Sequence, residues 1–198
     1  MRIQYNSPVI LTFSILTAVI HAIAEFTPLD IATEFFTVRD SMSITSPLDY
    51  FRLCSHVLGH SDWQHLTGNL TFILLLGPIL EERYGSRPVL VMIFATALIT
   101  GFINVAVPFF DGTWLRGASG VVFMLIVLSS LVNVKRGTVP LTFILIVVIF
   151  VGKEILAILR EDQVSQMAHI IGGALGSFFG FTLQDETPQS EQPPAPYA

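Results

Sequence analysis

The chain has 198 residues, of which 52% are hydrophobic and only 13% charged, whereas about a quarter of the residues in a water-soluble domain carry a charge. Its net charge of −5 is scattered and includes no cluster of Lys and Arg, which argues against a nucleic-acid partner. The single cysteine, Cys54, excludes an intrachain disulfide and a cysteine-based metal site. The composition therefore predicts an all-α membrane protein.

Six apolar segments approach the roughly 20 residues that a helix needs to cross a bilayer. They cover residues 8–26, 65–80, 88–107, 119–134, 139–159 and 168–183. We predict a bundle of six transmembrane helices over residues 1–183, with a long first loop at about 27–64. Residues 184–198 contain four prolines and few apolar residues, so we predict a disordered cytoplasmic tail.

The first segment has two interpretations. Arg2, the apolar stretch 9–20 and the run Ala22-Ile23-Ala24 resemble a cleaved signal peptide. A retained span is favoured because apolar residues continue almost unbroken from Pro8 to Phe26. Positive charge in short loops near span ends favours the cytoplasmic side of a membrane. Five of the ten basic residues lie in such positions on the side of the N-terminus, so both termini are predicted to be cytoplasmic; they are Arg2, Arg83, Arg87, Lys135 and Arg136.

Polar groups inside the segments are expensive in lipid and are therefore candidates for function, but Asn104 and Glu25 lie near segment ends and His21 stands alone. Four other polar residues are the main candidates. They are His65, Asn69, Ser119 and His169. The second, fourth and sixth segments must run in the same direction, so their depths can be compared. A rise of about 1.5 Å per residue places His65 and Ser119 roughly 24 Å, and His169 roughly 22 Å, above the inner face of the membrane. We expect these side chains to lie in one layer, with Asn69 one turn deeper than His65.

A serine and a histidine at matching depth are the minimum of an acyl-transfer site, because the base removes the proton of the weakly nucleophilic hydroxyl. Ser119 lies in Gly117-Ala118-Ser119-Gly120 at the start of the fourth segment. Unpaired backbone N–H groups at a helix start favour a developing oxyanion there. His65 and Asn69 are able to add side-chain donors.

The sixth segment carries Gly172, Gly176 and Gly180 on the helix face that also carries His169. Such small-residue stripes let helices approach closely, so we expect His169 to face another helix. The simpler alternative is that the glycines only pack, and that His169 bonds to a neighbouring backbone.

Motifs for other hydrolases are missing from the sequence. It contains no His-Glu-x-x-His, no Gly-x-Gly-Asp and no Gly-x-Ser-x-Gly, since position 121 is Val. His56, His60 and His65 suggest a metal site by spacing, but no carboxylate or thiolate completes an obvious ligand set, and no metal is expected.

Five motifs together, in order and spacing, resemble those of a rhomboid intramembrane serine protease of the minimal six-span bacterial type. The resemblance covers about residues 50–180. The motifs are Phe51-Arg52, His60-x4-His65-x3-Asn69, Glu81-x-Arg83-x-Gly85-Ser86, Gly117-Ala118-Ser119-Gly120 and Ala168-His169-x-x-Gly172-x-x-x-Gly176.

The resemblance implies that Ser119 is the nucleophile and His169 the general base of a catalytic dyad, with no metal or cofactor. It implies an oxyanion hole formed by His65, Asn69 and the N–H of Ser119, with Gly117, Phe123 and His60 as supporting residues. The expected function is hydrolysis of peptide bonds in or near the transmembrane segments of membrane-anchored, single-span proteins. The expected location is the lipid bilayer of a bacterial cytoplasmic membrane.

One departure concerns Phe123, because many relatives have Tyr at this position, four residues after the serine. The ring that packs on the histidine is kept and its hydroxyl is lost, so we expect a working but slower enzyme. The alternative is a catalytically weak binding or quality-control protein on the same fold. A small transporter is a third class, but the sequence lacks the mid-membrane charge pairs and inverted repeats of a transporter.

Overall fold

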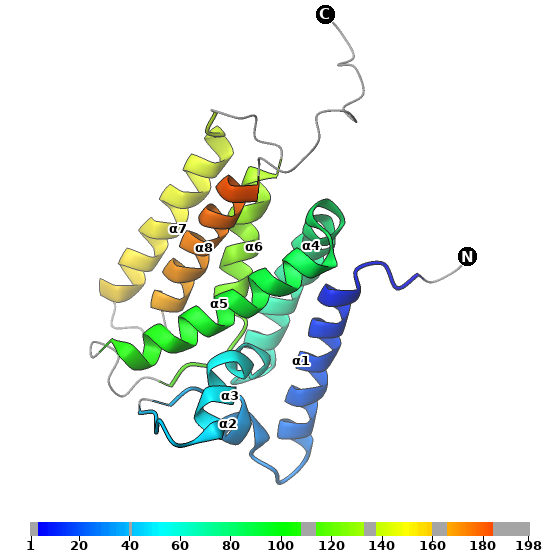
Figure 1. Ribbon diagram of the computed structural model, residues 1–198, viewed down its shortest axis with the longest axis vertical. Helices are drawn as coiled ribbons and strands as arrows, with labels where there is room; N and C mark the ends of the chain where they lie inside the picture. Colours follow the sequence, from blue (N-terminus) through cyan, green and yellow to red (C-terminus); the bar gives the residue numbers. More distant parts are fainter. Residues whose placement is uncertain (1–3, 40, 108–113, 133–137, 160–165, 184–198) are drawn as a thin grey trace, which may run out of the picture.

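The computed structural model of the protein describes residues 4–39, 41–107, 114–132, 138–159 and 166–183, and only the backbone of residues 150, 151 and 153–159. The described residues form a helical bundle (Figure 1), which confirms the predicted all-α class. The helices are α1 (Pro8–Phe26), α2 (Ile31–Phe35), α3 (Pro47–Ser55), η1 (His56–Leu58), α4 (Trp63–Tyr84), α5 (Ser86–Ala106), α6 (Ser119–Leu131), α7 (Leu141–Leu159) and α8 (Gln166–Thr182).

Each of the six predicted segments corresponds to one long helix, with ends that differ by a few residues. Within the described part of the chain, α1 and α5 are the two helices long and apolar enough to cross a membrane, and α6 is a shorter apolar helix of 13 residues. The count of six spans therefore stays a prediction. The predicted tail from residue 184 onward lies outside the described residues.

The first loop is more ordered than its sequence predicts, because it contains α2, α3 and η1. The Asp30 side chain caps α2 by accepting from the N–H of Thr33, and the Ser46 side chain caps α3 by accepting from the N–H of Asp49. Such caps satisfy backbone N–H groups that have no partner within the helix. These capping residues are the sequence signals that mark the two helices.

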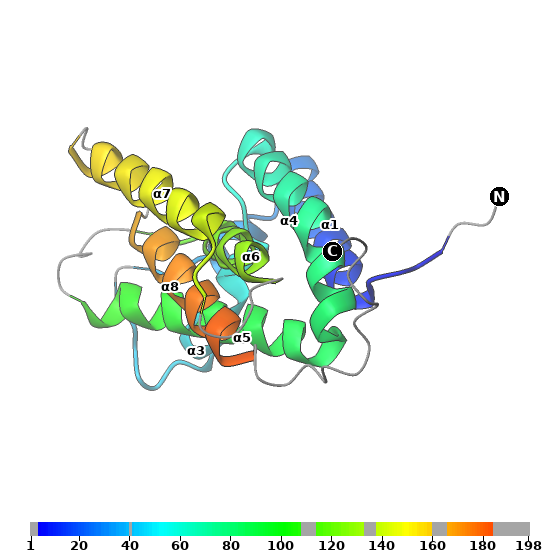
Figure 2. The ribbon, with the colours of Figure 1, turned by 90° about the horizontal axis from the view of Figure 1, so that it is seen from above.

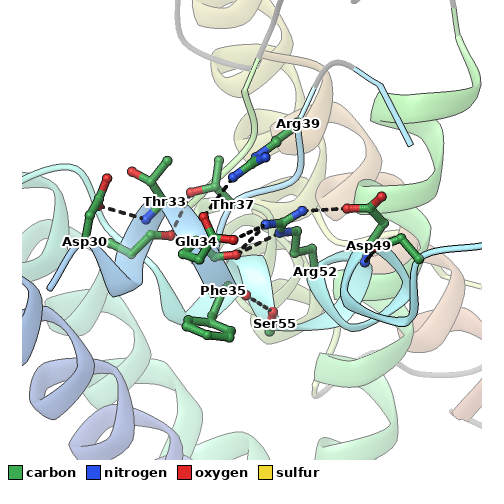
Figure 3. A network of polar contacts seen from close by, with 11 residues as sticks. Asp30, Thr33, Glu34, Phe35, Thr37, Arg39, Asp49, Arg52 and Ser55 are labelled. Carbon is green, nitrogen blue, oxygen red and sulfur yellow. Dashed lines mark hydrogen bonds and ion pairs between the residues drawn. The ribbon is translucent and has the colours of Figure 1, made fainter. Parts of the chain in front are cut away.

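Arg52 joins α2 to α3 (Figure 3). Arg52 is buried, and its guanidinium donates to the carbonyl oxygen of Glu34 at 2.6 and 2.9 Å and to the carboxylate of Asp49 at 2.5 Å. The N–H of Ser43 and the Arg52 guanidinium hold the pKa of Asp49 below its ordinary value. Since a buried charge needs both a counter-charge and hydrogen bonds, Arg52 fixes the two short helices relative to each other.

Glu81 connects three helices at the other end of the bundle. Its carboxylate accepts from the backbone N–H of Val9 and of Ile10, each at 3.0 Å, and from the hydroxyl of Ser86 at 2.7 Å. The cap residue of α1, Ser7, makes no side-chain capping bond, so Glu81 takes that role from α4. The start of α1 therefore lies at the same end as the turn between α4 and α5.

α6 occupies the centre of the bundle, with α7 and α8 on one side and α4 and α1 on the other when the molecule is seen from above (Figure 2). Most of its apolar side chains are buried, and five of them have no exposed surface, namely Val121, Met124, Leu125, Leu128 and Leu131. The most extensive helix contact is between α6 and α8. Both helices are therefore held by packing along their whole length.

Glycines of α8 allow its backbone to lie close to that of α6. A methyl group placed on Gly172 would overlap the backbone oxygen of Gly120, and one placed on Gly176 would lie 2.5 Å from the backbone oxygen of Met124. The glycine stripe of the sixth segment therefore faces α6.

Gly172→Ala is expected to destabilise the protein by about 1–3 kcal/mol or more, because α8 must move away from α6 to admit the methyl group. Gly68→Ala is the matched control, since a methyl group at Gly68 in α4 meets no atom within 4 Å. The control should be neutral or slightly stabilising, because alanine is the better helix former. Thermal unfolding in detergent measures both. Equal stability of the two variants would contradict the close packing of α6 on α8.

Candidate active site

The segment that leads into α6 is held by the first loop. The N–H of Gly117 donates to the carbonyl oxygen of His56 at 2.9 Å, and the N–H of Ala118 donates to Nε2 of His60 at 3.4 Å. Two backbone hydrogen bonds between Val38 and Leu115, each 2.9 Å long, add a further connection. Ser119 follows as the first residue of α6, so the first loop determines where its hydroxyl lies.

His65 lies directly against Gly117. A methyl group on Gly117 would lie 2.5 Å from Cε1 and 2.7 Å from Nε2 of the His65 ring. Gly117 also has a φ of 122°, a conformation that side-chain-bearing residues rarely adopt. Both observations explain why the position requires glycine, and they place the Nε2 edge of His65 beside the segment that carries Ser119.

His60 connects Asn69 to the same segment. Its Nε2 lies 2.9 Å from Nδ2 of Asn69 and accepts there, since it also accepts the N–H of Ala118. Burial is the main cause that lowers the pKa of His60 to about 3, and the neighbouring His65 and His21 lower it further. His60 is therefore neutral, and it orients the Asn69 amide with its NH₂ group towards the imidazole.

His169 lies on α8 where that helix touches the start of α6. A methyl group on Gly120 would lie 3.1 Å from the backbone oxygen of Ala168, so the residues next to Ser119 and His169 are in contact. His169 is 9% exposed, and its ring centroid lies 4.5 Å from that of Phe123 at an interplanar angle of 40°. Phe123 thus packs on the histidine ring from the same helix that begins with Ser119.

These contacts bring the sequence-predicted residues to one end of α6. Ser119 is half-buried at the helix start, where backbone N–H groups of the first turn have no partner within the helix. His65 and Asn69 approach from α4, and His169 approaches from α8. A hydroxyl, an imidazole and several N–H donors around one helix start are the components of acyl transfer through an oxyanion.

The histidines do not converge on a common point that a metal ion could occupy. His56 bonds through Nε2 to the backbone oxygen of Ala97 at 3.0 Å, and Nε2 of His60 is taken by Asn69. In the described ranges, no group of three His, Cys, Asp or Glu side chains has a geometry that would hold a metal ion.

Sequence reasoning missed three features of the site. His56 holds Gly117 through its backbone oxygen, although the sequence suggested it only as a metal ligand. His21 packs edge-on against Trp63, with ring centroids 4.6 Å apart. Asp62 caps α4 by accepting from the N–H of His65 at 2.8 Å. Of the three, only the cap had a sequence signal, an aspartate immediately before the helix.

A family model matches most of this chain. The model of the Rhomboid domain matches residues 47–186, well over half of the chain, and the match includes the four polar residues found inside the predicted segments. Rhomboid proteins are integral membrane proteins, and most of them are serine proteases. The chain belongs to the rhomboid family.

Proposed function

We propose that the protein is an intramembrane serine endopeptidase, which hydrolyses peptide bonds in or near the transmembrane segments of membrane-anchored, single-span proteins. Ser119 is the nucleophile of this proposal and His169 its general base. The observation that carries it is the contact of α6 with α8 at Gly120 and Ala168, next to both residues. The packing of Phe123 on the His169 ring supports the same assignment.

The proposed reaction has two halves. His169 takes the hydroxyl proton of Ser119 as its oxygen attacks the substrate carbonyl, and the protonated imidazole then gives that proton to the leaving amine. Water attacks the resulting ester in the second half, again with His169 as the base, and releases the carboxylic acid and the serine. The N–H of Ser119 and the side chains of His65 and Asn69 stabilise the oxyanion in both halves.

The proposed location is a bacterial cytoplasmic membrane, with six spans and both termini in the cytoplasm. The contact of Glu81 with the start of α1 supports this topology, because it brings the N-terminal side and the turn between α4 and α5 to one end. Arg83 and Arg87 flank that turn, and positive charge in short loops favours the cytoplasmic side. The reaction requires no metal or cofactor.

A second candidate function is that of a catalytically weak rhomboid protein that binds membrane proteins. The observation that favours it is Phe123, whose ring contacts His169 without a hydroxyl that could hold the imidazole by a hydrogen bond. The ring contact itself is kept, so the protease remains the better-supported function.

Covalent labelling separates the two functions. The purified full chain in liposomes is treated with a fluorophosphonate probe, and the modified peptide is identified by mass spectrometry. We expect modification at Ser119 and cleavage of a single-span test protein, because an activated serine is required for both. A folded protein that neither labels nor cleaves would contradict the protease and support the binding function.

A further inference from the structure

Ser61 and Asp62, immediately before α4, form a chain of hydrogen bonds to His65. The hydroxyl of Ser61 donates to Oδ2 of Asp62 at 2.6 Å, and Nδ1 of His65 lies 3.2 Å from the same hydroxyl oxygen. The other carboxylate oxygen of Asp62 accepts the backbone N–H of His65 at 2.8 Å. The carboxylate is therefore connected to His65 both through its backbone and through its ring.

The direction of these hydrogen bonds shows that Nδ1 of His65 carries a proton. A serine hydroxyl has one proton, and an ionised carboxylate only accepts, so the proton of Ser61 is directed to Asp62. The Ser61 oxygen must then accept from Nδ1–H of His65. In this arrangement Nε2, on the edge that lies against Gly117, carries a proton only when the ring is an imidazolium.

The charges around His65 make the carboxylate important. Burial of the ring is the largest influence and disfavours a cation, and the charged or titratable groups that act on the ring are Asp62 at the start of its own helix, Arg116 before α6 and His21 on α1. His60 of the first loop lies close as well, with ring centroids 4.9 Å apart. Arg116 repels a cationic ring, and His60 is neutral and so offers the ring no charge. Asp62 is the one negative group among them, and it reaches the ring through Ser61.

We propose that Ser61 and Asp62 are positioning residues of the oxyanion hole. Through the Ser61 hydroxyl, the Asp62 carboxylate fixes the His65 ring and stabilises the imidazolium, whose Nε2–H then donates to the oxyanion. This inference rests on the protease function proposed above. We call the chain of hydrogen bonds from Asp62 through Ser61 to His65 the relay. A donor that carries a charge forms a shorter and stronger hydrogen bond to an oxyanion than a neutral donor, so the relay acts on the transition state rather than on substrate binding.

The test uses the full chain in liposomes and measures kcat and KM for a single-span substrate together with the melting temperature. Ser61→Ala breaks the relay and leaves the Asp62 cap in place. Asp62→Asn removes the charge but keeps an oxygen that can cap α4. Ser61→Thr retains the hydroxyl. Ser43→Ala is the matched control, because Ser43 is an exposed serine of the same loop whose hydroxyl bonds to Thr45.

We expect Ser61→Ala and Asp62→Asn each to lower kcat about 10-fold with KM and melting temperature unchanged, less than the loss of a whole oxyanion donor because His65 remains. Ser61→Thr should recover the wild-type kcat, and Ser43→Ala should not change it. The double variant Ser61→Ala/Asp62→Asn should lose no more than either single variant, since both act on one chain of bonds.

The outcomes separate this relay from the proposed function. An active wild type with unchanged kcat in Ser61→Ala and Asp62→Asn contradicts the relay alone. A loss of kcat that Ser61→Thr does not restore, or that follows the melting temperature, also contradicts it and indicates a structural role. A folded wild type that neither cleaves nor labels contradicts the proposed function, and the relay with it.

Discussion

Ser119→Ala and His169→Ala are each expected to reduce cleavage of a single-span substrate by at least about 10⁴-fold, because each variant removes one half of the nucleophile and base pair. Without its hydroxyl, residue 119 cannot form the acyl-enzyme ester. Without the imidazole, the hydroxyl of Ser119 keeps its proton at neutral pH. The double variant should be no slower than either single variant, since residues that act as a unit are not additive.

The measurement compares kcat/KM in liposomes and fluorophosphonate labelling of the same preparations. Ser130→Ala is the matched control on the same helix, because the Ser130 hydroxyl donates to the backbone oxygen of Val127 at 2.6 Å and has no catalytic role in the proposal. It should cleave and label like wild type. Melting temperatures of the Ser119 and His169 variants should stay near wild type. Retained cleavage in a folded Ser119→Ala protein would overturn the assignment of the nucleophile.

The positions of the long helices were predictable because apolar runs in this sequence end at charged or turn-forming residues. Residues 65–80 were predicted as a span, and α4 extends from Trp63 to Tyr84 because Asp62 caps its start and Gly85, with a φ of 86°, ends it. The short helices of the first loop were not predicted. They are too short for a hydrophobic period, and only their caps mark them.

The residues of the candidate site were predictable as polar residues in apolar segments, whereas their contacts were not. Counting helical rise placed Ser119 and His169 in one layer, and the contact between Gly120 and Ala168 agrees with that estimate. The bond from Asn69 to His60 depends on how the first loop folds back, which no local pattern encodes. The catalytic roles themselves stay predictions until the variants are measured.

Mild acid is expected to destabilise the protein strongly through His56 and His60 of the first loop. His56 and His60 are 1% and 2% exposed. Burial lowers the pKa of His56 to about 4 and that of His60 to about 3, from an ordinary value of 6.5. Both are neutral in the folded protein at pH 5, whereas both are protonated in the unfolded chain. The unfolded state therefore binds more protons, and stability falls as the pH falls.

The pH range in which stability is lost follows from the pKa values of the two histidines. The contribution of the two histidines is complete above about pH 6.5 and is lost as the pH falls from there towards about 4 and 3. At pH 5 each histidine has lowered the free energy of unfolding by about 2 kcal/mol relative to neutral pH, and the two together by roughly 4 kcal/mol. Asp49 and Asp62 have pKa values lowered from 3.8, so their contributions are lost only at more acidic pH.

The free energy of unfolding in mixed micelles at pH 7, 6 and 5 tests this expectation. His56→Gln keeps an N–H donor for the backbone oxygen of Ala97 but cannot titrate, so its stability should fall by about 2 kcal/mol less than wild type between pH 7 and 5. Thr100→Val is the control, because it removes a neighbouring hydroxyl that donates to the backbone oxygen of Thr96 without changing the number of titrating groups.

That control should be less stable at every pH and should keep the wild-type slope. The slope, rather than the absolute stability, is the decisive quantity, because both substitutions disturb the same buried cluster between η1 and α5. Equal stability of the wild type at pH 7 and 5 would contradict the expectation, because it would mean that His56 and His60 bind as many protons in the folded protein as in the unfolded chain. A His56→Gln variant with the wild-type slope would place the acid sensitivity at a residue other than His56.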